Sequence, residues 1–210
     1  MERNIFDSHS HYDDEQFDGD RNDLLASLPQ KGVELAVSCG CDLEKCVAIG
    51  EIGLDYHWMS SSKEKQREFF TRQCLLANEL DMPVIVHDRE AHGDTLDILK
   101  QTQPKGVVHC FSGSKEMAAD IIRLGMYIGL NGVATFKNAR KSLEVAKAIP
   151  IERLVLETDC PYLAPEPYRG RRNDSSYIAY IAERLAPELN VSAQELLSIT
   201  NENARRLYNM

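Results

Sequence analysis

The hydrophobic positions of this chain form short apolar runs that alternate with longer amphipathic segments. The apolar runs, several of them rich in β-branched residues, predict seven strands, within residues 5–11, 33–38, 47–56, 83–87, 106–109, 127–130 and 153–159. Apolar residues at helical spacing predict helices at 23–28, 63–80, 94–100, 115–124 and 139–149, and at 176–185, 192–200 and 203–208 after an irregular loop at 161–173. Strands that alternate with helices indicate an α/β fold with a parallel sheet.

The polar residues at the ends of these strands favour a (β/α)8 TIM barrel over an open sheet. They follow many different strands, whereas an open sheet gathers its site at one switch point. We expect a single barrel domain that covers residues 1–210, because no linker, repeat or low-complexity tract divides the chain.

The barrel is predicted to lack one strand–helix unit between Cys41 and Val47. Only residues 42–46 separate these two positions, whereas a parallel crossover needs about a dozen residues. The chain also has 210 residues and seven strand signals, against about 250 residues and eight strands in typical barrels of this kind. We therefore infer that the unit is absent, by deletion or by omission from the sequence.

Composition and charge narrow the class of protein. The net charge of −9 and the pI near 5.2 give no general attraction to nucleic acid or anionic membranes, so any contact with nucleic acid would be local or made through bound cations. No apolar run approaches the roughly 18 residues of a membrane span, and no signal peptide is expected. Six scattered cysteines without a Cys-x-x-Cys pair favour reduced thiols and a cytoplasmic protein. Cys39 and Cys41 form a Cys-x-Cys pair that is interpreted as strand-end packing, with a redox or metal role as the less favoured alternative.

Metal-capable side chains recur at the ends of the predicted strands. His9 and His11 are two residues apart, so both side chains point to the same side of an extended strand. Later strands end on four further residues of this kind, namely Glu51, His87, His109 and Asp159. Four imidazoles and two carboxylates exceed the needs of one ion and suit two adjacent divalent ions, which a carboxylate such as Glu51 can bridge.

Each of these residues also has a structural interpretation when it is taken singly. His87 and His109 could be hydrogen-bonded core histidines, Asp159 could cap a turn, and Glu51 could lie in a tight turn. Their recurrence at strand ends favours the metal site. The two remaining histidines fall in predicted loops and are expected at the surface: His57 and His92.

The motifs around these residues resemble those of the TatD-type metal-dependent deoxyribonucleases of the amidohydrolase superfamily. The resemblance covers essentially the whole chain and rests on Asp7-Ser-His-Ser-His11, Gly50-Glu-Ile-Gly-Leu-Asp-Tyr56, Val86-His-Asp-Arg-Glu90, His109-Cys-Phe-Ser-Gly113, Leu156-Glu-Thr-Asp159, Pro161-Tyr-Leu-Ala-Pro165, Arg169-Gly-Arg-Arg-Asn173 and Asn203-Ala-Arg-Arg-Leu207. It implies a (β/α)8 barrel of the metal-dependent hydrolase type. The family's strand that ends in Gly-x-His-Pro has no counterpart here, and its place coincides with the missing unit.

The resemblance also implies a ligand set and an activity. The six residues would divide between two divalent ions with Glu51 as the bridge: His9, His11 and Asp159 on one ion, His87 and His109 on the other. The implied activity is 3′-to-5′ exonuclease action on DNA, with Asp159 and Glu51 as catalytic residues, and the implied process is DNA repair. The residue types leave the metal open, because histidines suit zinc or iron and carboxylates also admit magnesium or manganese.

Hydrolysis of a DNA phosphodiester requires a base for the attacking water and cations for the backbone. Asp159, a ligand that can also accept a proton, is the candidate base. Cationic side chains on or after predicted strand ends are the candidate phosphate contacts: Arg89, Lys137, Arg169, Arg171 and Arg172. Tyr162 and Phe111 are interpreted either as base-stacking or as core residues. The protein is expected to be a monomer or a weak oligomer.

Two other functions stay open. One is a hydrolase of the same superfamily that acts on a small phosphoester, lactone or cyclic amide. Many of those enzymes bridge their ions with a carboxylated lysine, and the presence of Glu51 and histidines at the matching positions disfavours that version. The other is an inactive truncated paralogue that binds metal or nucleic acid, an interpretation that rests on the missing unit alone.

Overall fold

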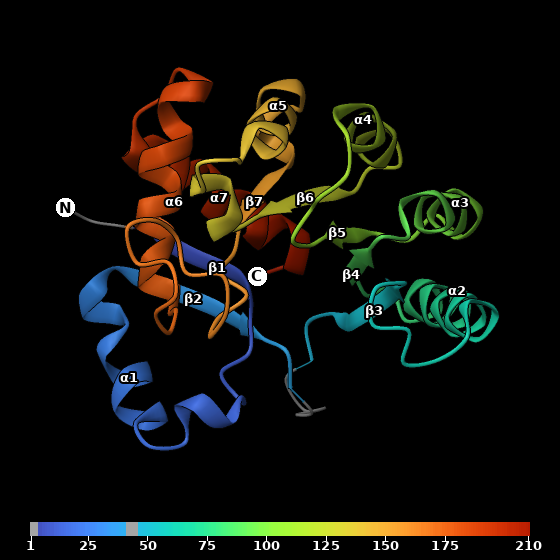
Figure 1. Ribbon diagram of the computed structural model, residues 1–210, viewed down its shortest axis with the longest axis horizontal. Helices are drawn as coiled ribbons and strands as arrows, with labels where there is room; N and C mark the ends of the chain where they lie inside the picture. Colours follow the sequence, from blue (N-terminus) through green and yellow to red (C-terminus); the bar gives the residue numbers. More distant parts are fainter. Residues whose placement is uncertain (1–3, 41–45) are drawn as a thin grey trace.

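The computed structural model describes residues 4–40 and 46–210, in which strands and helices alternate along the chain (Figure 1). The strands are β1 (Ile5–Ser10), β2 (Val33–Ser38), β3 (Ile49–Asp55), β4 (Val84–Arg89), β5 (Gly106–Val108), β6 (Tyr127–Leu130) and β7 (Leu154–Leu156). The α-helices are α1 (Arg21–Ser27), α2 (Lys63–Glu79), α3 (His92–Thr102), α4 (Lys115–Arg123), α5 (Arg140–Ala148), α6 (Ile178–Leu185) and α7 (Ala193–Tyr208). Short 3-10 helices include η1 (Glu15–Phe17), η4 (Gly132–Thr135), η5 (Ile151–Arg153) and η6 (Ser175–Tyr177). The predicted parallel α/β arrangement is confirmed.

The strands form two parallel sheets that together make an open barrel. One sheet pairs β1 with β2, and the other has the order β3-β4-β5-β6-β7. Beyond the last strand, the Asp159 N–H donates to the His9 carbonyl at 3.0 Å and the His11 N–H donates to the Cys160 carbonyl at 2.8 Å, which joins the end of β7 to the end of β1. Within residues 4–40 and 46–210, β2 and β3 are not paired. The predicted missing unit falls at this opening, and residues 41–45 lie outside the described residues.

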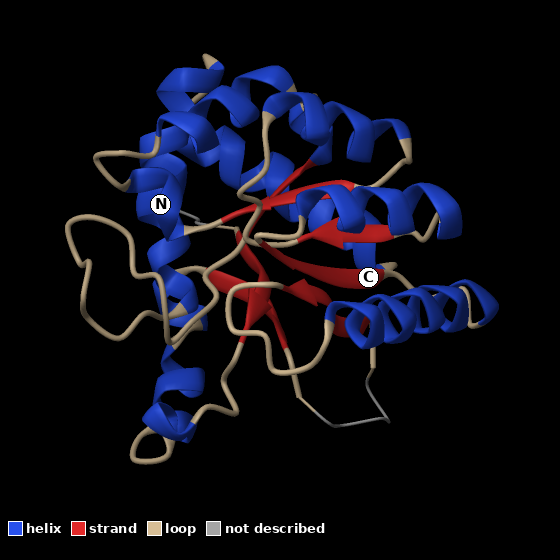
Figure 2. Cartoon of the chain, turned by 45° about the vertical axis from the view of Figure 1, so that its right-hand side comes forward, coloured by secondary structure: helices blue, strands red, loops and turns tan. Residues whose placement is uncertain are grey.

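The two faces of the five-stranded sheet pack against different helices. In β4, Val84 and Val86 belong to the large core beneath the outer helices, whereas Ile85 belongs to a second cluster with Leu207 and Tyr208 of α7. The strands therefore lie inside an outer layer of helices, with α7 against their other face (Figures 1 and 2). Because both faces are buried, the strands need apolar residues at successive positions, which explains their short, β-branched-rich runs.

Several element boundaries differ from those predicted. The two helices expected at 192–200 and 203–208 are one helix, α7, because Asn203, a poor helix former, donates its side-chain amide to the carbonyls of Ile151 and Leu154 at 2.8 and 2.7 Å. The prediction that His92 lies in a loop is wrong, since this residue begins α3 and its ring contacts Asp88 at 2.8 Å. None of the helices in the described ranges is both long and apolar enough to cross a membrane.

A buried carboxylate holds the beginning of the chain to its end. Asp7 of β1 is fully buried and accepts hydrogen bonds from the Thr158 N–H at 3.0 Å, the Thr158 hydroxyl at 2.5 Å and the Ser175 hydroxyl at 2.6 Å. Burial raises the pKa of Asp7 to about 6, and these hydrogen bonds limit the rise. The carboxylate thus fixes β1, the segment after β7 and η6 in one position.

We expect replacement of Asp7 by alanine to lower the free energy of unfolding by about 3 kcal/mol, because three buried donors then lose their acceptor. Urea unfolding of Asp7→Ala against the parent chain measures this loss. Asp97→Ala is the matched control, since Asp97 is exposed on α3, and its midpoint should hardly move. Equal midpoints for both variants would contradict the proposed role of Asp7.

Candidate metal centre

The structure brings all six predicted metal-capable residues together, five of them in the carboxyl-terminal half of a strand or after it, whereas Glu51 is the third residue of β3. They come from five strands or from the residues directly after them, and each has a side-chain atom within 4 Å of another member of the set: His9, His11, Glu51, His87, His109 and Asp159.

One half of this cluster is built on β1 and on the segment after β7. The Nε2 atoms of His9 and His11 are 3.1 Å apart, and each lies 3.4 Å from Oδ1 of Asp159. Oε2 of Glu51 lies 3.7 Å from the His9 nitrogen and 3.8 Å from the His11 nitrogen. Two imidazole nitrogens and two carboxylate oxygens therefore converge on one small region.

The other half is built on β3, β4 and β5. Oε1 of Glu51 lies 2.6 Å from Nδ1 of His87 and 2.7 Å from Nε2 of His109, and these two nitrogens are 3.3 Å apart. The two oxygens of Glu51 therefore face different pairs of histidines.

The backbone allows this close approach of β3 and β4. Gly53 has a φ of +144°, and a Cβ atom there would lie 2.0 Å from the carbonyl oxygen of His87. A glycine is therefore required beside His87. Asp159, with a φ of 59°, adopts the left-handed conformation, an unfavourable backbone for most residues, and its N–H is fixed by the His9 carbonyl at 3.0 Å.

The charges in the Glu51 half depend on one another. Burial favours the neutral form of Glu51, but hydrogen bonds to His109 and His87 and the positive charge of His109 hold its pKa well below the ordinary range. Burial would lower the pKa of His109, yet the hydrogen bond and the charge of Glu51 raise it to about 9. Glu51 raises the pKa of His87 against the same effect of burial. Without a cation, His109 thus carries a positive charge at pH 7 beside the Glu51 carboxylate.

In the Asp159 half the carboxylate is also ionised. Burial raises the pKa of Asp159, but hydrogen bonds from His11 and His9 outweigh that effect and hold it well below the ordinary range. The hydrogen bond with Asp159 raises the pKa of His11. Burial, with the positive charge of His109 beside it, lowers the pKa of His9 to about 4, so this imidazole is neutral at pH 7.

Three histidines of the cluster have a second partner that the sequence analysis did not identify. Nε2 of His87 lies 3.3 Å from Oδ2 of Asp55, and Nδ1 of His109 lies 3.7 Å from Oε1 of Glu157. Burial raises the pKa of Glu157 to about 8. Both acids belong to the motifs already quoted, at or just past the ends of β3 and β7, so their position was a usable signal. The third partner is Cys39.

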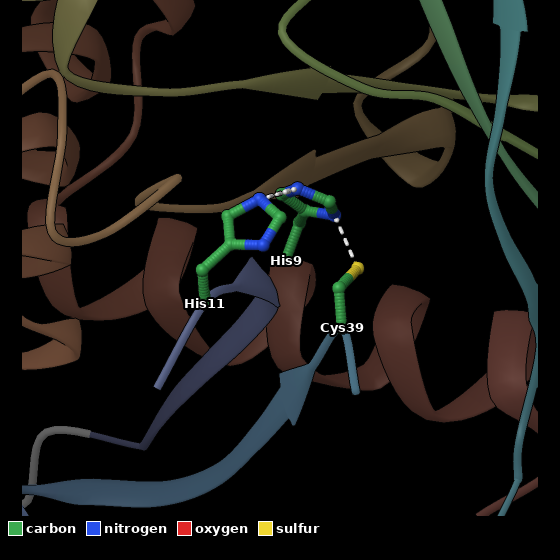
Figure 3. Close-up of side chains that lie close together, drawn as sticks. All are labelled: His9, His11 and Cys39. Atoms are coloured by element: carbon green, nitrogen blue, oxygen red, sulfur yellow. Dashed lines mark hydrogen bonds between the residues drawn. The ribbon is translucent and has the colours of Figure 1, made fainter. Parts of the chain in front are cut away.

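Figure 3 shows His9 between His11 and Cys39. The Cys39 sulfur lies 3.4 Å from Nδ1 of His9, on the ring edge opposite the nitrogen that faces His11. Cys39 therefore contacts the cluster, which the interpretation as strand-end packing did not foresee. Cys41, the other half of that interpretation, lies outside the described residues.

The donors of this cluster fit divalent cations. Imidazole nitrogens and carboxylate oxygens converge in two groups that share Glu51, a pattern that suits zinc, iron(II) or manganese. Asp55 reaches the far nitrogen of the His87 ring, as partners of metal-binding histidines generally do. Glu157 lies 3.7 Å from the far nitrogen of the His109 ring, and that nitrogen makes no hydrogen bond.

The predicted phosphate contacts occupy different surroundings. Arg169 and Arg171 are exposed and, together with Tyr162, line a cavity of about 470 Å³ beside the turn that follows Asp159. Arg172 lines it as well, but its guanidinium donates two hydrogen bonds to the Asp20 carboxylate, at 2.7 and 2.6 Å.

The remaining predicted substrate contacts lie on other segments. The Arg89 guanidinium is 5.7 Å from the centre of the exposed Trp58 ring, and Lys137 is exposed in the segment after η4. Phe111 is buried in the main core. A further cavity of about 420 Å³ borders the cluster itself, with Glu51 and His87 on one wall and Lys65 of α2 on another. His57 lies in a turn after β3 with its ring 2.9 Å from Glu90, as expected for a loop residue.

Comparisons with known proteins relate this chain to a family of metal-dependent hydrolases. Residues 41–209 match the sequence profile of the family described as TatD related DNase. The chain is 38% identical to the uncharacterized metal-dependent hydrolase YabD of Bacillus subtilis, over 97% of this chain and 98% of that protein. It is 41% identical to the uncharacterized metal-dependent hydrolase YcfH of Escherichia coli, over 80% of this chain and 64% of that protein. It is 37% identical to the 3′-5′ ssDNA/RNA exonuclease TatD of Pantoea vagans, over 78% of this chain and 66% of that protein.

A solved structure extends the agreement to the fold. The crystal structure of YJJV, a TatD homolog from Escherichia coli, superposes with a TM-score of 0.86 at 27% identity and covers 100% of both chains. The alignment with YabD spans 251 positions, more than the 210 residues of this chain, so it includes positions of the relative that have no counterpart here. That surplus agrees with a missing unit.

Binding of a divalent cation is expected to release protons, and the affinity is expected to rise with pH up to about 9. His109 has a pKa of about 9 in the metal-free protein and must lose its proton to act as a ligand. Calorimetric titration of the metal-free chain with Zn²⁺ or Mn²⁺, in buffers of different ionisation enthalpy, measures the protons released at pH 7. A binding enthalpy that does not depend on the buffer would contradict the expectation. In Glu51→Gln the charge that raises the pKa of His109 is lost, so fewer protons should be released.

Proposed function

Because this chain belongs to the TatD family of metal-dependent hydrolases, described as TatD related DNase, we propose that it hydrolyses DNA phosphodiester bonds with two divalent ions and removes nucleotides from the 3′ end. The observation that carries the proposal is the division of the Glu51 carboxylate between two groups of ligands. A phosphodiester needs its attacking and leaving oxygens stabilised together, which two adjacent cations can do.

In this proposal the cluster divides as its contacts do. One ion would be held by His9, His11 and Asp159 and the other by His87 and His109, and Glu51 would be shared by the two groups. When bound, such ions polarise phosphoryl oxygens and lower the pKa of water.

The side chains supply the proton transfer and the alignment. Asp159 is ionised and partly exposed, with 18% of its side-chain surface accessible, so it can accept the proton of the attacking water. Asp55 holds the His87 ring from its far side. The Asp159 backbone N–H is bound to the His9 carbonyl, so the base keeps a fixed position relative to the His9 ligand.

DNA as the substrate class is supported by the surroundings of the cluster and by one relative. Arg169 and Arg171 line a cavity that begins at the turn after Asp159, and arginine guanidinium groups suit backbone phosphates. The related protein of Pantoea vagans carries the name of a 3′-5′ ssDNA/RNA exonuclease. Arginine side chains gathered at one place allow a protein with a negative net charge to hold the DNA polyanion.

Replacement of Asp159 by asparagine is expected to reduce turnover at least about a hundredfold, because the amide cannot take up the proton. The assay follows 3′-labelled and 5′-labelled single-stranded DNA with added Mg²⁺ or Mn²⁺ and with EDTA. Stepwise loss from the 3′ end that EDTA abolishes is the expected result. Asp97→Asn, an exposed aspartate on α3, is the matched control and should retain full activity.

Two outcomes would count against the proposal. Undiminished cleavage by Asp159→Asn would exclude this residue as the base. A folded, metal-loaded chain that leaves DNA intact but hydrolyses a small phosphoester or lactone would move the substrate to another class of the superfamily.

Replacement of Arg169 by glutamine should weaken the binding of single-stranded DNA and lower the slope of log affinity against log salt by about 0.7, the value for one lost phosphate contact. Fluorescence anisotropy measures this in the Asp159→Asn background, which leaves the DNA uncut. Arg140→Gln is the matched control, because Arg140 is exposed on α5 and ion-paired with Glu144 at 2.8 Å. An unchanged slope for Arg169→Gln would place this residue outside the DNA path.

A further inference from the structure

Three imidazoles of the cluster have a partner at the ring nitrogen that points away from the ligand groups, and one of these partners is unlike the others. His87 has the carboxylate of Asp55 at 3.3 Å, and for His109 the nearest carboxyl group, that of Glu157, lies 3.7 Å away without a hydrogen bond. His9 has the sulfur of Cys39 at 3.4 Å from Nδ1. Metal-binding histidines usually donate this second N–H to a carboxylate, a backbone carbonyl or water. A thiol at this position is therefore a specific feature of the chain.

The geometry separates the sulfur from the ligand groups. His9, His11 and Cys39 lie close enough together to resemble a three-ligand metal site. However, Nε2 of His9 faces His11 and Asp159, whereas Nδ1 faces Cys39 (Figure 3). The two nitrogens of an imidazole point in different directions, so an ion held by Nε2 with Asp159 and His11 cannot also be reached by this sulfur.

We propose that Cys39 is a positioning residue for His9, whose Nδ1–H donates to the thiol sulfur so that Nε2 is presented to the cation. The inference rests on the metal site of the proposed function. A neutral imidazole that binds a cation through Nε2 carries its proton on Nδ1, and the sulfur is the acceptor within reach.

The pairing of β1 with β2 holds the sulfur in place. The Cys39 N–H donates to the Ser10 carbonyl at 2.8 Å, and the Ser10 hydroxyl donates to the Val37 carbonyl at 2.9 Å. The Tyr12 N–H donates to the Ser38 hydroxyl at 3.1 Å. These hydrogen bonds hold the end of β2 against the segment that carries His9. The position of the Cys39 thiol is therefore set by the pairing with β1 and does not depend on the edge of β2 that faces β3.

Cys39 also borders a cavity of about 350 Å³ between β2 and β3. Cys46 lines the same cavity, but its sulfur contacts the Ala48 carbonyl at 3.0 Å. The cavity is therefore lined by two cysteines, the half-buried Cys39, which touches a predicted ligand, and the exposed Cys46, which contacts the Ala48 carbonyl. This pair gives the test a matched control.

The test measures the affinity for Zn²⁺ and Mn²⁺ by competition with a chromophoric chelator. We expect Cys39→Ala to lose about tenfold in affinity for one of the two ions. Cys39→Ser should recover part of the loss, because a hydroxyl can also accept from Nδ1–H. Cys46→Ser should bind as the parent chain does. Thermal unfolding of the metal-free variants checks that the loss does not come from a destabilised fold.

A second measurement separates a positioning role from direct ligation. The chain loaded with Co²⁺ should lack a thiolate-to-metal charge-transfer absorption, and the spectrum of Cys39→Ser should show the same transitions as that of the parent. A charge-transfer band that disappears in Cys39→Ser would overturn the proposal, because the sulfur would then be a ligand. Equal metal affinities of Cys39→Ala and the parent would also overturn it. A parent chain that binds no divalent ion would instead refute the proposed function.

Discussion

The structure of this site depends on the sharing of one carboxylate by four imidazoles. Glu51 places one oxygen 2.6 and 2.7 Å from the nitrogens of His87 and His109, and the other oxygen faces His9 and His11. A buried carboxylate is unfavourable unless it is paired, and so is a buried imidazolium. Each charge in this group is stable because the opposite charge is present. A metal cation can take the place of the protons on the histidines while the carboxylate stays as it is.

The backbone reaches this arrangement through two units of different construction. His9, His11 and Asp159 form one unit, because the residues after β7 are hydrogen-bonded to the end of β1 and because Asp7 ties β1 to Thr158. The other unit is the parallel pairing of β3, β4 and β5, which places Glu51, His87 and His109 on or directly after neighbouring strands. The parallel direction of the strands is the main reason that these residues lie close together, since parallel strands bring all their carboxyl ends to the same edge.

The sequence was sufficient to predict the strands and the six clustered residues, because both follow from local patterns. A histidine or carboxylate directly after an apolar run is visible without any knowledge of the fold. The partners on the far side of the rings could not be predicted in the same way. Whether Cys39 contacts His9 depends on the register of β1 against β2 and on the ring orientation. That Arg172 is bound to Asp20, 152 residues earlier, is likewise a property of the folded chain alone.

The opening between β2 and β3 would give a cation bound at the candidate metal centre a structural role as well. The sheet pair β1–β2 and the five-stranded sheet meet directly where β7 joins β1, and on the other side β2 and β3 are unpaired in the described part of the chain. Glu51 of β3 nevertheless reaches the histidines of β1, at 3.7 and 3.8 Å. A cation held between Glu51 and those histidines would connect the two sheets without a strand between them. Ligands that bind only the folded state stabilise it, so a cation bound there would also help to keep an open barrel in register.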